Sequence, residues 1–388
     1  MRRLCSLFSF ALVALLATAT LGTTLAAQAP STGPYKVLKT VKVGGEGGWD
    51  YIYADPVGRR LYIPRGATRA VEATDSKPAI PASESRITIF NLDTLAPLGE
   101  IPDSGGNGVA VCPNTGHGFS SSHPDVSMFD TKTDKLIKKI VVAPAQPDGI
   151  YCDTSNDRVY VFSHPTKNAT VIDAKDGTVL GTIDLGGTPE QGVADGHGTL
   201  YVVMQDRPGS VAVVDEAAMK TTTHYPFGEN GGCNGLALDV KNHILFAACS
   251  AVGPRPAPGT PPPAADAHPQ AMVILNATNG NILTKLPIAG GSDGAVFNPA
   301  YKTAFSTQGN GTLTIVKENS PTSFVVEQNL DTMNGARTIT LDTKTNHIFT
   351  MSQEFEPPPA NAPPVAPGGR GPRRVAVPGS FTILMIGK

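Results

Sequence analysis

A repeat of about 42 residues is the feature of this sequence that most restricts its fold. Each copy opens with a polar residue and a mostly small residue, followed by alternating apolar positions. The pattern is clear in Asp148-Gly149-Ile150-Tyr151-Cys152. Such period-two alternation indicates β-strands rather than helices. The seven copies begin at Asp50, Asn107, Asp148, Gln191, Asn234, Asp293 and Arg337.

Each copy has the strand content of one propeller blade. A second strand follows the first after a turn, as at 158–161, a third ends in a polar residue, as at 171–173, and a fourth follows, as at 179–183. Four short strands in a unit of this length are typical of a β-propeller blade. We therefore predict an all-β, seven-bladed propeller over residues 35–388.

The two ends of the chain are predicted to close the ring. The last copy supplies strands only at 338–341, 347–352 and 381–386, and so lacks a fourth. Residues Tyr35–Val43 precede the first copy and have the pattern of a fourth strand. Pairing this segment with the last blade would satisfy both free edges.

One stretch of the chain resembles a known repeat family. Residues 158–161 have the Tyr-Val strand, residues 170–173 the Val-Ile-Asp strand, and residues 185–189 the Gly-x-x-Pro turn of the YVTN repeat. The chain is thus similar to YVTN/YncE-like repeat propellers over nearly all of 35–388. This resemblance implies the architecture but no activity.

The N-terminus has the pattern of an export signal. Arg2 and Arg3 precede an apolar stretch and then small residues up to Ala29, which predicts a signal peptide at 1–29 and a periplasmic or secreted protein. No later segment is apolar enough to cross a bilayer. The formal net charge of -2 does not indicate a nucleic-acid partner.

Three Pro- and Ala-rich insertions interrupt the repeat near 65–85, 252–270 and 356–379. Each falls between the second and third strands of its copy. Because successive strands are antiparallel, all three should leave the ring on the face where the innermost strands begin. The polar residues that open the seven copies should surround the tunnel mouth on this same face.

The mouth offers candidate ligand-binding side chains but no confident metal or cofactor. The opening residues supply oxygen ligands that allow a divalent cation, and Arg337 allows an anionic or polyhydroxylated ligand instead. His123 and His164 lie in matching Ser-His-Pro segments of neighbouring copies, either through repeat inheritance or as a metal-binding or acid–base pair. Trp49, beside Asp50, is a further ligand-binding candidate.

The cysteines that remain after signal removal fall into two predicted pairs. A tight hairpin near 240–242 would place Cys233 opposite Cys249, and Cys112 and Cys152 lie on neighbouring innermost strands. An oxidising compartment would permit both disulfides.

The leading functional hypothesis is a non-catalytic binding or scaffolding protein that uses the face with the insertions. Its partner would be a small molecule, a protein or a component of the cell envelope. The alternative is a lactonase-like hydrolase or lyase with a metal or a histidine pair in the same mouth. The sequence shows no recognisable nucleophile elbow.

Overall fold

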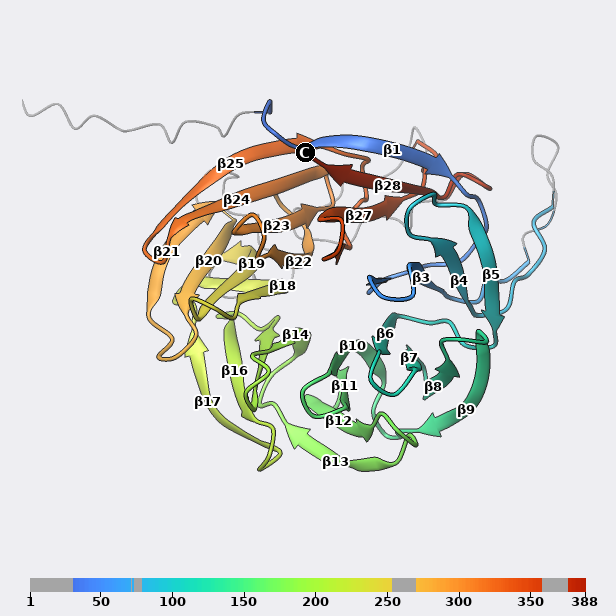
Figure 1. Cartoon of the computed structure of the whole chain (residues 1–388), viewed down its shortest axis with the longest axis horizontal. Helices are drawn as coiled ribbons and strands as arrows, with labels where there is room; N and C mark the ends of the chain where they lie inside the picture. Colours follow the sequence, from blue (N-terminus) through green and yellow to red (C-terminus); the bar gives the residue numbers. More distant parts are fainter. Residues whose placement is uncertain (1–30, 71, 73–78, 253–269, 358–375) are drawn as a thin grey trace, which may run out of the picture.

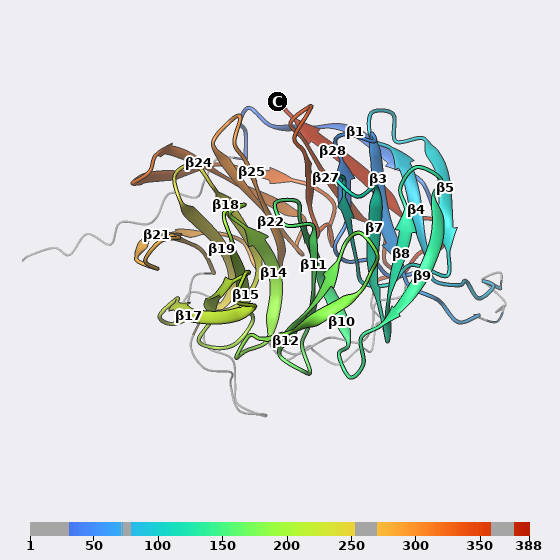
Figure 2. The same ribbon diagram turned by 60° about the horizontal axis from the view of Figure 1, so that its bottom comes forward.

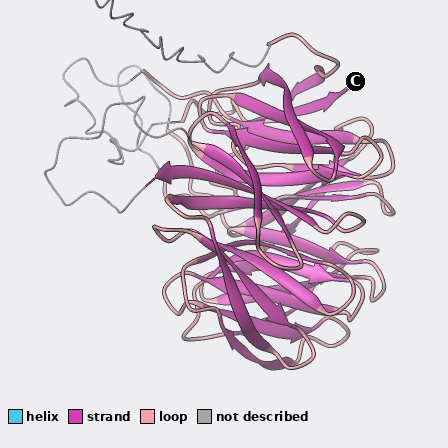
Figure 3. Ribbon diagram, turned by 90° about the vertical axis from the view of Figure 1, so that its left-hand side faces the viewer, coloured by secondary structure: helices cyan, strands magenta, loops and turns pink. Residues whose placement is uncertain are grey.

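The chain folds into a ring of seven radial sheets. The computed structural model describes residues 31–70, 72, 79–252, 270–357 and 376–388, so the predicted signal peptide lies outside the described residues. Each sheet has four strands, all neighbours are antiparallel, and the sheets are arranged around a central axis (Figure 1). We call the end of this axis where the innermost strands begin the tunnel mouth. The described regular structure consists of strands, as Figure 3 shows. The chain is therefore a seven-bladed β-propeller, as predicted.

The first six blades run in chain order, each from its innermost to its outermost strand. Blade 1 contains β2 (Tyr53–Asp55), β3 (Arg60–Arg65), β4 (Arg86–Asn91) and β5 (Pro97–Pro102). Blade 2 contains β6 (Gly108–Cys112), β7 (His117–Ser122), β8 (Asp125–Asp130) and β9 (Lys135–Val141). Blade 3 contains β10 (Pro147–Asp153), β11 (Arg158–Ser163), β12 (Asn168–Asp173) and β13 (Val179–Asp184).

The second half of the ring repeats the same arrangement. Blade 4 contains β14 (Pro189–Ala194), β15 (Thr199–Met204), β16 (Ser210–Asp215) and β17 (Lys220–Pro226). Blade 5 contains β18 (Asn230–Asp239), β19 (Ile244–Val252), β20 (Ala271–Asn276) and β21 (Ile282–Pro287). Blade 6 contains β22 (Ser292–Asn298), β23 (Thr303–Gln308), β24 (Thr312–Ser320) and β25 (Ser323–Asp331).

Blade 7 combines both ends of the chain. It contains β26 (Thr340–Asp342), β27 (His347–Ser352), β28 (Thr382–Gly387) and, on the outside, β1 (Lys36–Lys42). β1 pairs antiparallel with β28, with Val41 opposite Ile383. Figure 1 shows these two strands side by side at the top of the ring. The predicted closure by the N-terminal strand is confirmed.

All seven outermost strands have an irregularity that hinders their pairing with a strand of another chain. In every blade the outermost strand shows a register shift against its inner neighbour. A bulge bends and twists an edge strand, which makes it a poor template for another chain.

The hydrophobic core is divided among the blade interfaces. The buried apolar residues form seven clusters, and each fills the space between two neighbouring blades. Between blades 1 and 2, for example, the rings of Tyr62 and Phe129 lie 5.6 Å apart. This packing between neighbouring blades holds the first residues of the innermost strands in fixed positions.

Two disulfides join strands at or next to the tunnel. Cys112 in β6 is bonded to Cys152 in β10 of the next blade, with their Cα atoms 5.8 Å apart. Cys233 in β18 is bonded to Cys249, which lies directly opposite it in β19. These are the two pairs expected from the sequence.

The three insertions leave the ring by equivalent connections. They join β3 to β4, β19 to β20 and β27 to β28, which are second-to-third strand connections in blades 1, 5 and 7. Such connections emerge on the face where the innermost strands begin, because the sheets are antiparallel. The innermost strands β10, β14, β18 and β22 contact one another in this order, and Figure 2 shows them in a view turned from that of Figure 1. Most of the second and third insertions lie outside the described residues, as do residues 71 and 73–78 of the first.

Arg65 fastens the segment before blade 1 to the last blade. It is 1% exposed, and its guanidinium carbon lies 3.8 Å from the ring centre of Phe381 and 5.7 Å from that of Trp49. Its Nε and Nη2 groups donate to the carbonyls of Gly47 and Gly45. Burial lowers the pKa of Arg65 to about 9. Trp49 packs edge-to-face on Phe381, and so belongs to the packing between blades 7 and 1.

We expect Arg65→Ala to lower the free energy of unfolding by about 3 kcal/mol, because it leaves a cavity and two carbonyls without donors. Urea denaturation measures this loss. Lys42→Ala is the matched control, since its partner Glu354 is an exposed surface residue and such a pair contributes at most about 1 kcal/mol. Equal losses in the two variants would contradict the proposed role of Arg65.

Candidate functional site at the tunnel mouth

The seven polar residues predicted to surround the mouth all lie near the start of innermost strands. Four are within β10, β14, β18 and β22, and three precede β2, β6 and β26. Their side chains do not form one uniform ring, because some bind neighbouring backbone and others gather in two linked clusters. The residues within the strands are Asp148, Gln191, Asn234 and Asp293, and the residues before the strands are Asp50, Asn107 and Arg337.

One cluster brings together Asp148, His164 and Glu190. His164 Nε2 lies 3.0 Å from Asp148 Oδ2 and 3.3 Å from Glu190 Oε1. Asp148 is in β10, His164 follows β11, and Glu190 is in β14, so the cluster spans the boundary between blades 3 and 4. The three donor atoms all lie within 4.8 Å of one another. This is a spacing that suits a metal ion.

Two further side chains orient the carboxylate of Glu190. Tyr51 Oη donates to its Oε2 at 2.7 Å, and Gln205 Nε2 donates to its Oε1 at 2.7 Å. Tyr51 belongs to blade 1, so its phenol reaches across the tunnel to blade 4. The carboxylate is only 6% exposed and is held from two directions.

The second cluster centres on Asp293. Its Oδ1 accepts a hydrogen bond from Asn234 Nδ2 at 3.3 Å, and its Oδ2 lies 3.1 Å from Arg337 Nε. Gln205 Nε2 also contacts Asn234 Oδ1 at 3.4 Å. This contact links the Asp293 cluster to Glu190 and hence to the first cluster.

The crowded carboxyl groups change one another's protonation. Burial raises the pKa of Asp50 well above its usual range, and the charges of Asp293 and Asp148 raise it further. Burial also raises the pKa of Asp293, although Arg337 and Asn234 oppose this. Burial therefore favours the protonated form of both carboxyl groups.

His164 and Glu190 influence each other in opposite directions. Asp148 and then Glu190 raise the pKa of His164 to about 10, so the imidazole is a cation at neutral pH. Burial raises the pKa of Glu190, and His164 and Tyr51 lower it again. The cluster therefore holds its carboxyl groups against one protonated imidazole.

Two of the predicted residues bind backbone instead of facing a ligand. Gln191 Nε2 donates to the carbonyl of Ala295 at 2.9 Å, and its Oε1 accepts from the amides of Leu236 and Ala295. Asn107 Nδ2 donates to the carbonyl of Pro147 at 3.0 Å. Both side chains tie innermost strands together, which is a structural role.

His123 and His164 do not form the pair considered in the sequence analysis. His123 lines a separate hollow with Asp103, Asp125 and Lys139, while His164 lies between Asp148 and Glu190. The two histidines thus occupy equivalent positions of neighbouring repeats but lie in different sites. A hydrolase that depends on this histidine pair has no structural support.

The sequence analysis missed Glu190, Tyr51 and Gln205. For Glu190 a signal was present, because Glu190 follows Pro189 just as Asp148 follows Pro147. Aligning blade 4 on the small residue Gly192 selected Gln191 instead. Neighbouring residues of a strand point to opposite sides, so this shift of one residue chose a side chain directed elsewhere.

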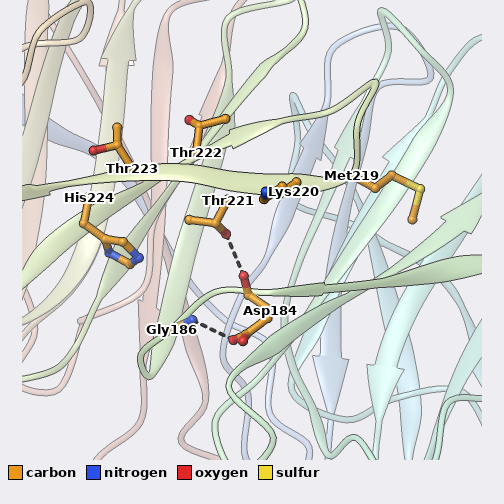
Figure 4. Close-up of a pocket in the computed structure, with 8 residues that line it drawn as sticks. All are labelled: Asp184, Gly186, Met219, Lys220, Thr221, Thr222, Thr223 and His224. Carbon is orange, nitrogen blue, oxygen red and sulfur yellow. Dashed lines mark hydrogen bonds between the residues drawn. The ribbon is translucent and has the colours of Figure 1, made fainter.

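Another hollow lies on the outer side of the ring, between the outermost strands of blades 3 and 4. It has a volume of about 380 Å³ and is lined by the end of β13 and by β17, including Asp184, Thr221 and His224 (Figure 4). Most of its side chains are exposed, and Thr221 Oγ1 donates to the Asp184 carbonyl. Outermost strands line this hollow, whereas innermost strands line the mouth, so it is not part of the candidate site.

Comparisons with known proteins identify the fold class. The chain is similar to a chain of Kuenenia stuttgartiensis hydrazine synthase, with TM-score 0.62 and 15% identity, covering 86% of this chain and 95% of that chain. It is also similar to a chain in the crystal structure of the mitotic checkpoint complex, with TM-score 0.60 and 11% identity, covering 89% and 95%. No family model and no curated protein matches the sequence. These likenesses support the seven-bladed β-propeller and carry no function.

Among the described residues, no helix has the length and apolar character needed to span a membrane.

Proposed function

We propose that this chain is an exported binding protein whose tunnel mouth takes a small ligand that carries positive charge. The observation that carries the proposal is the excess of acidic groups at the mouth. The described residues of the two clusters, together with the neighbouring Asp50, place four carboxyl groups against two basic groups. The carboxyl groups belong to Asp50, Asp148, Glu190 and Asp293, and the basic groups to His164 and Arg337.

The energetics of the buried carboxyl groups favour a cationic ligand. An ionised carboxylate loses hydration when it is buried, and it then takes up a proton or needs a nearby cation. The raised pKa values of Asp50 and Asp293 are a sign of this unmet demand. A bound cation would stabilise the ionised forms and would be stabilised by them.

The position of the site also fits a binding role. The three insertions leave the ring on the same face as the mouth, and loops on one face of a rigid scaffold commonly form binding surfaces. Export rests on the signal-like segment 1–29, and the YVTN/YncE-like resemblance rests on the repeat pattern.

The proposal is tested by thermal-shift screening against a panel of small amines, polyamines and divalent cations, with carboxylates and sugars as comparison compounds. We expect cations alone to raise the melting temperature. The double variant Asp50→Asn/Asp293→Asn should weaken amine and polyamine binding by about tenfold or more, because it removes two carboxyl groups that a bound cation would stabilise in the ionised form.

The matched control is Asp103→Asn, which removes an exposed carboxylate on the same face that pairs with Lys139. It should leave binding unchanged. Binding of neutral or anionic compounds that survives the double variant would overturn the proposal, and so would the absence of any cationic ligand.

A further inference from the structure

The Asp148–His164–Glu190 cluster has the composition of a transition-metal site. It offers one imidazole nitrogen and two carboxylate oxygens within 4.8 Å of one another. Calcium and magnesium prefer sites built from oxygen alone, whereas imidazole favours zinc and its first-row neighbours. A nitrogen in the donor set therefore separates this cluster from an ordinary acidic patch.

The imidazole nitrogen of this cluster is ion-paired to two carboxylates, but with poor hydrogen-bond geometry. His164 Nε2 is buried and makes no well-directed hydrogen bond, although two carboxylate oxygens lie near it. A metal ion placed among the three side chains would displace the proton of the His164 imidazole to solvent and take this nitrogen and both oxygens as ligands. The side chains of His164 and Asp148 are 33% and 20% exposed, which leaves room for water or a ligand on the open side.

The donors are held in place by surrounding hydrogen bonds. Tyr51 and Gln205 orient Glu190, as described above, which is how neighbouring groups position metal ligands in many proteins. The turn that carries His164 is braced by Thr166, whose Oγ1 donates to Ser163 Oγ at 2.7 Å. Ser163 Oγ in turn accepts from the Gln146 amide at 3.0 Å, close to Asp148.

We infer that Asp148, His164 and Glu190 form a binding site for one first-row divalent cation of the zinc class. This inference rests on the proposed function, because it names the cation that the acidic mouth takes. A bound ion there would be open to a second ligand.

The test is calorimetric titration of chelator-treated full-length protein with ZnCl₂, together with Co²⁺ absorption spectra. We expect one equivalent of zinc to bind, with magnesium binding much more weakly. His164→Gln and Glu190→Gln should each weaken zinc binding by about tenfold or more, since each removes a direct ligand.

His123→Gln is the matched control, because it changes the same residue type at the equivalent position of the neighbouring blade, outside the cluster. It should bind zinc like the unaltered protein. Circular dichroism confirms that each variant is folded. If His164→Gln is unfolded, Glu190→Gln decides, since it retains the size of the side chain.

The outcomes separate this inference from the proposed function. Failure to bind zinc, or equal binding by folded His164→Gln and Glu190→Gln, overturns the metal site. If amines still bind through Asp50 and Asp293 in that case, the proposed cation-binding mouth stands without the metal site. If neither zinc nor any amine binds, both proposals fall.

Discussion

Removal of residues 1–43 is expected to abolish the folded monomer. Without β1, blade 7 loses its outermost strand, the outer edge of β28 loses its backbone partner, and Leu330 of β25 loses Tyr35 and Val37 from its apolar cluster. Tyr35, which is 2% exposed and packs on Phe305 at 5.2 Å, would be lost as well. The backbone pairing and buried area removed correspond to about 5 kcal/mol or more, which is comparable with the whole stability of many domains.

Size-exclusion chromatography and circular dichroism measure this outcome. Removal of residues 1–30 alone is the matched control and should leave a folded monomer, because β1 is retained. A synthetic peptide of residues 31–43 should restore folding when it is added to the shorter chain. A stable monomer that lacks β1 would contradict the described ring closure.

Two buried acid pairs are expected to make stability depend on pH. Glu216 of blade 4 lies against Asp153 of blade 3, and Glu318 of blade 6 lies against Asp239 of blade 5. Both glutamates are 2% exposed or less. Burial and then the neighbouring aspartate raise the pKa of Glu216 and of Glu318 to about 7.

The direction of the effect follows from proton binding. Between the ordinary pKa of 4.5 and the folded value of about 7, the folded protein holds protons that the unfolded chain has released. The contribution of each glutamate is therefore complete below pH 4.5, decreases as the pH rises, and is lost above about pH 7. The upper bound is about 3 kcal/mol for each group.

The double variant Glu216→Gln/Glu318→Gln tests this expectation by urea denaturation at several pH values. An amide can donate to the aspartate as a protonated carboxyl group does, but it cannot ionise. We expect the variant to gain several kcal/mol relative to the unaltered protein between about pH 4.5 and pH 8. Glu100→Gln, at an exposed position, is the control. Parallel pH profiles for the variant and the unaltered protein would contradict the buried-pair mechanism.

The sequence predicted the fold well because its signals are local and repeated. Alternating apolar residues and turns recur seven times, and the strand expected at 347–352 is observed as β27. The N-terminal strand was predicted at Tyr35–Val43 and is found at Lys36–Lys42. A missing strand at one end and a spare strand at the other were sufficient to predict the closure.

The candidate site was only partly predictable, because its contacts cross the ring. Asp148, Asp293 and Arg337 were selected through their equivalent repeat positions. The hydrogen bond between Tyr51 and Glu190 joins residues 139 positions apart, and no repeat pattern encodes such a contact. The equivalence of His123 and His164 was misleading for the same reason, since neighbouring blades share a backbone position but differ in their surroundings.

The most direct test of the charged mouth is the location of a bound metal ion in crystals of the protein grown with zinc. Anomalous diffraction at the zinc edge should give a peak among the side chains of Asp148, His164 and Glu190, with Tyr51 still directed at Glu190. A strong peak only at histidines outside the mouth would contradict this account. The same conclusion would follow if the carboxyl groups of the innermost strands pointed away from one another.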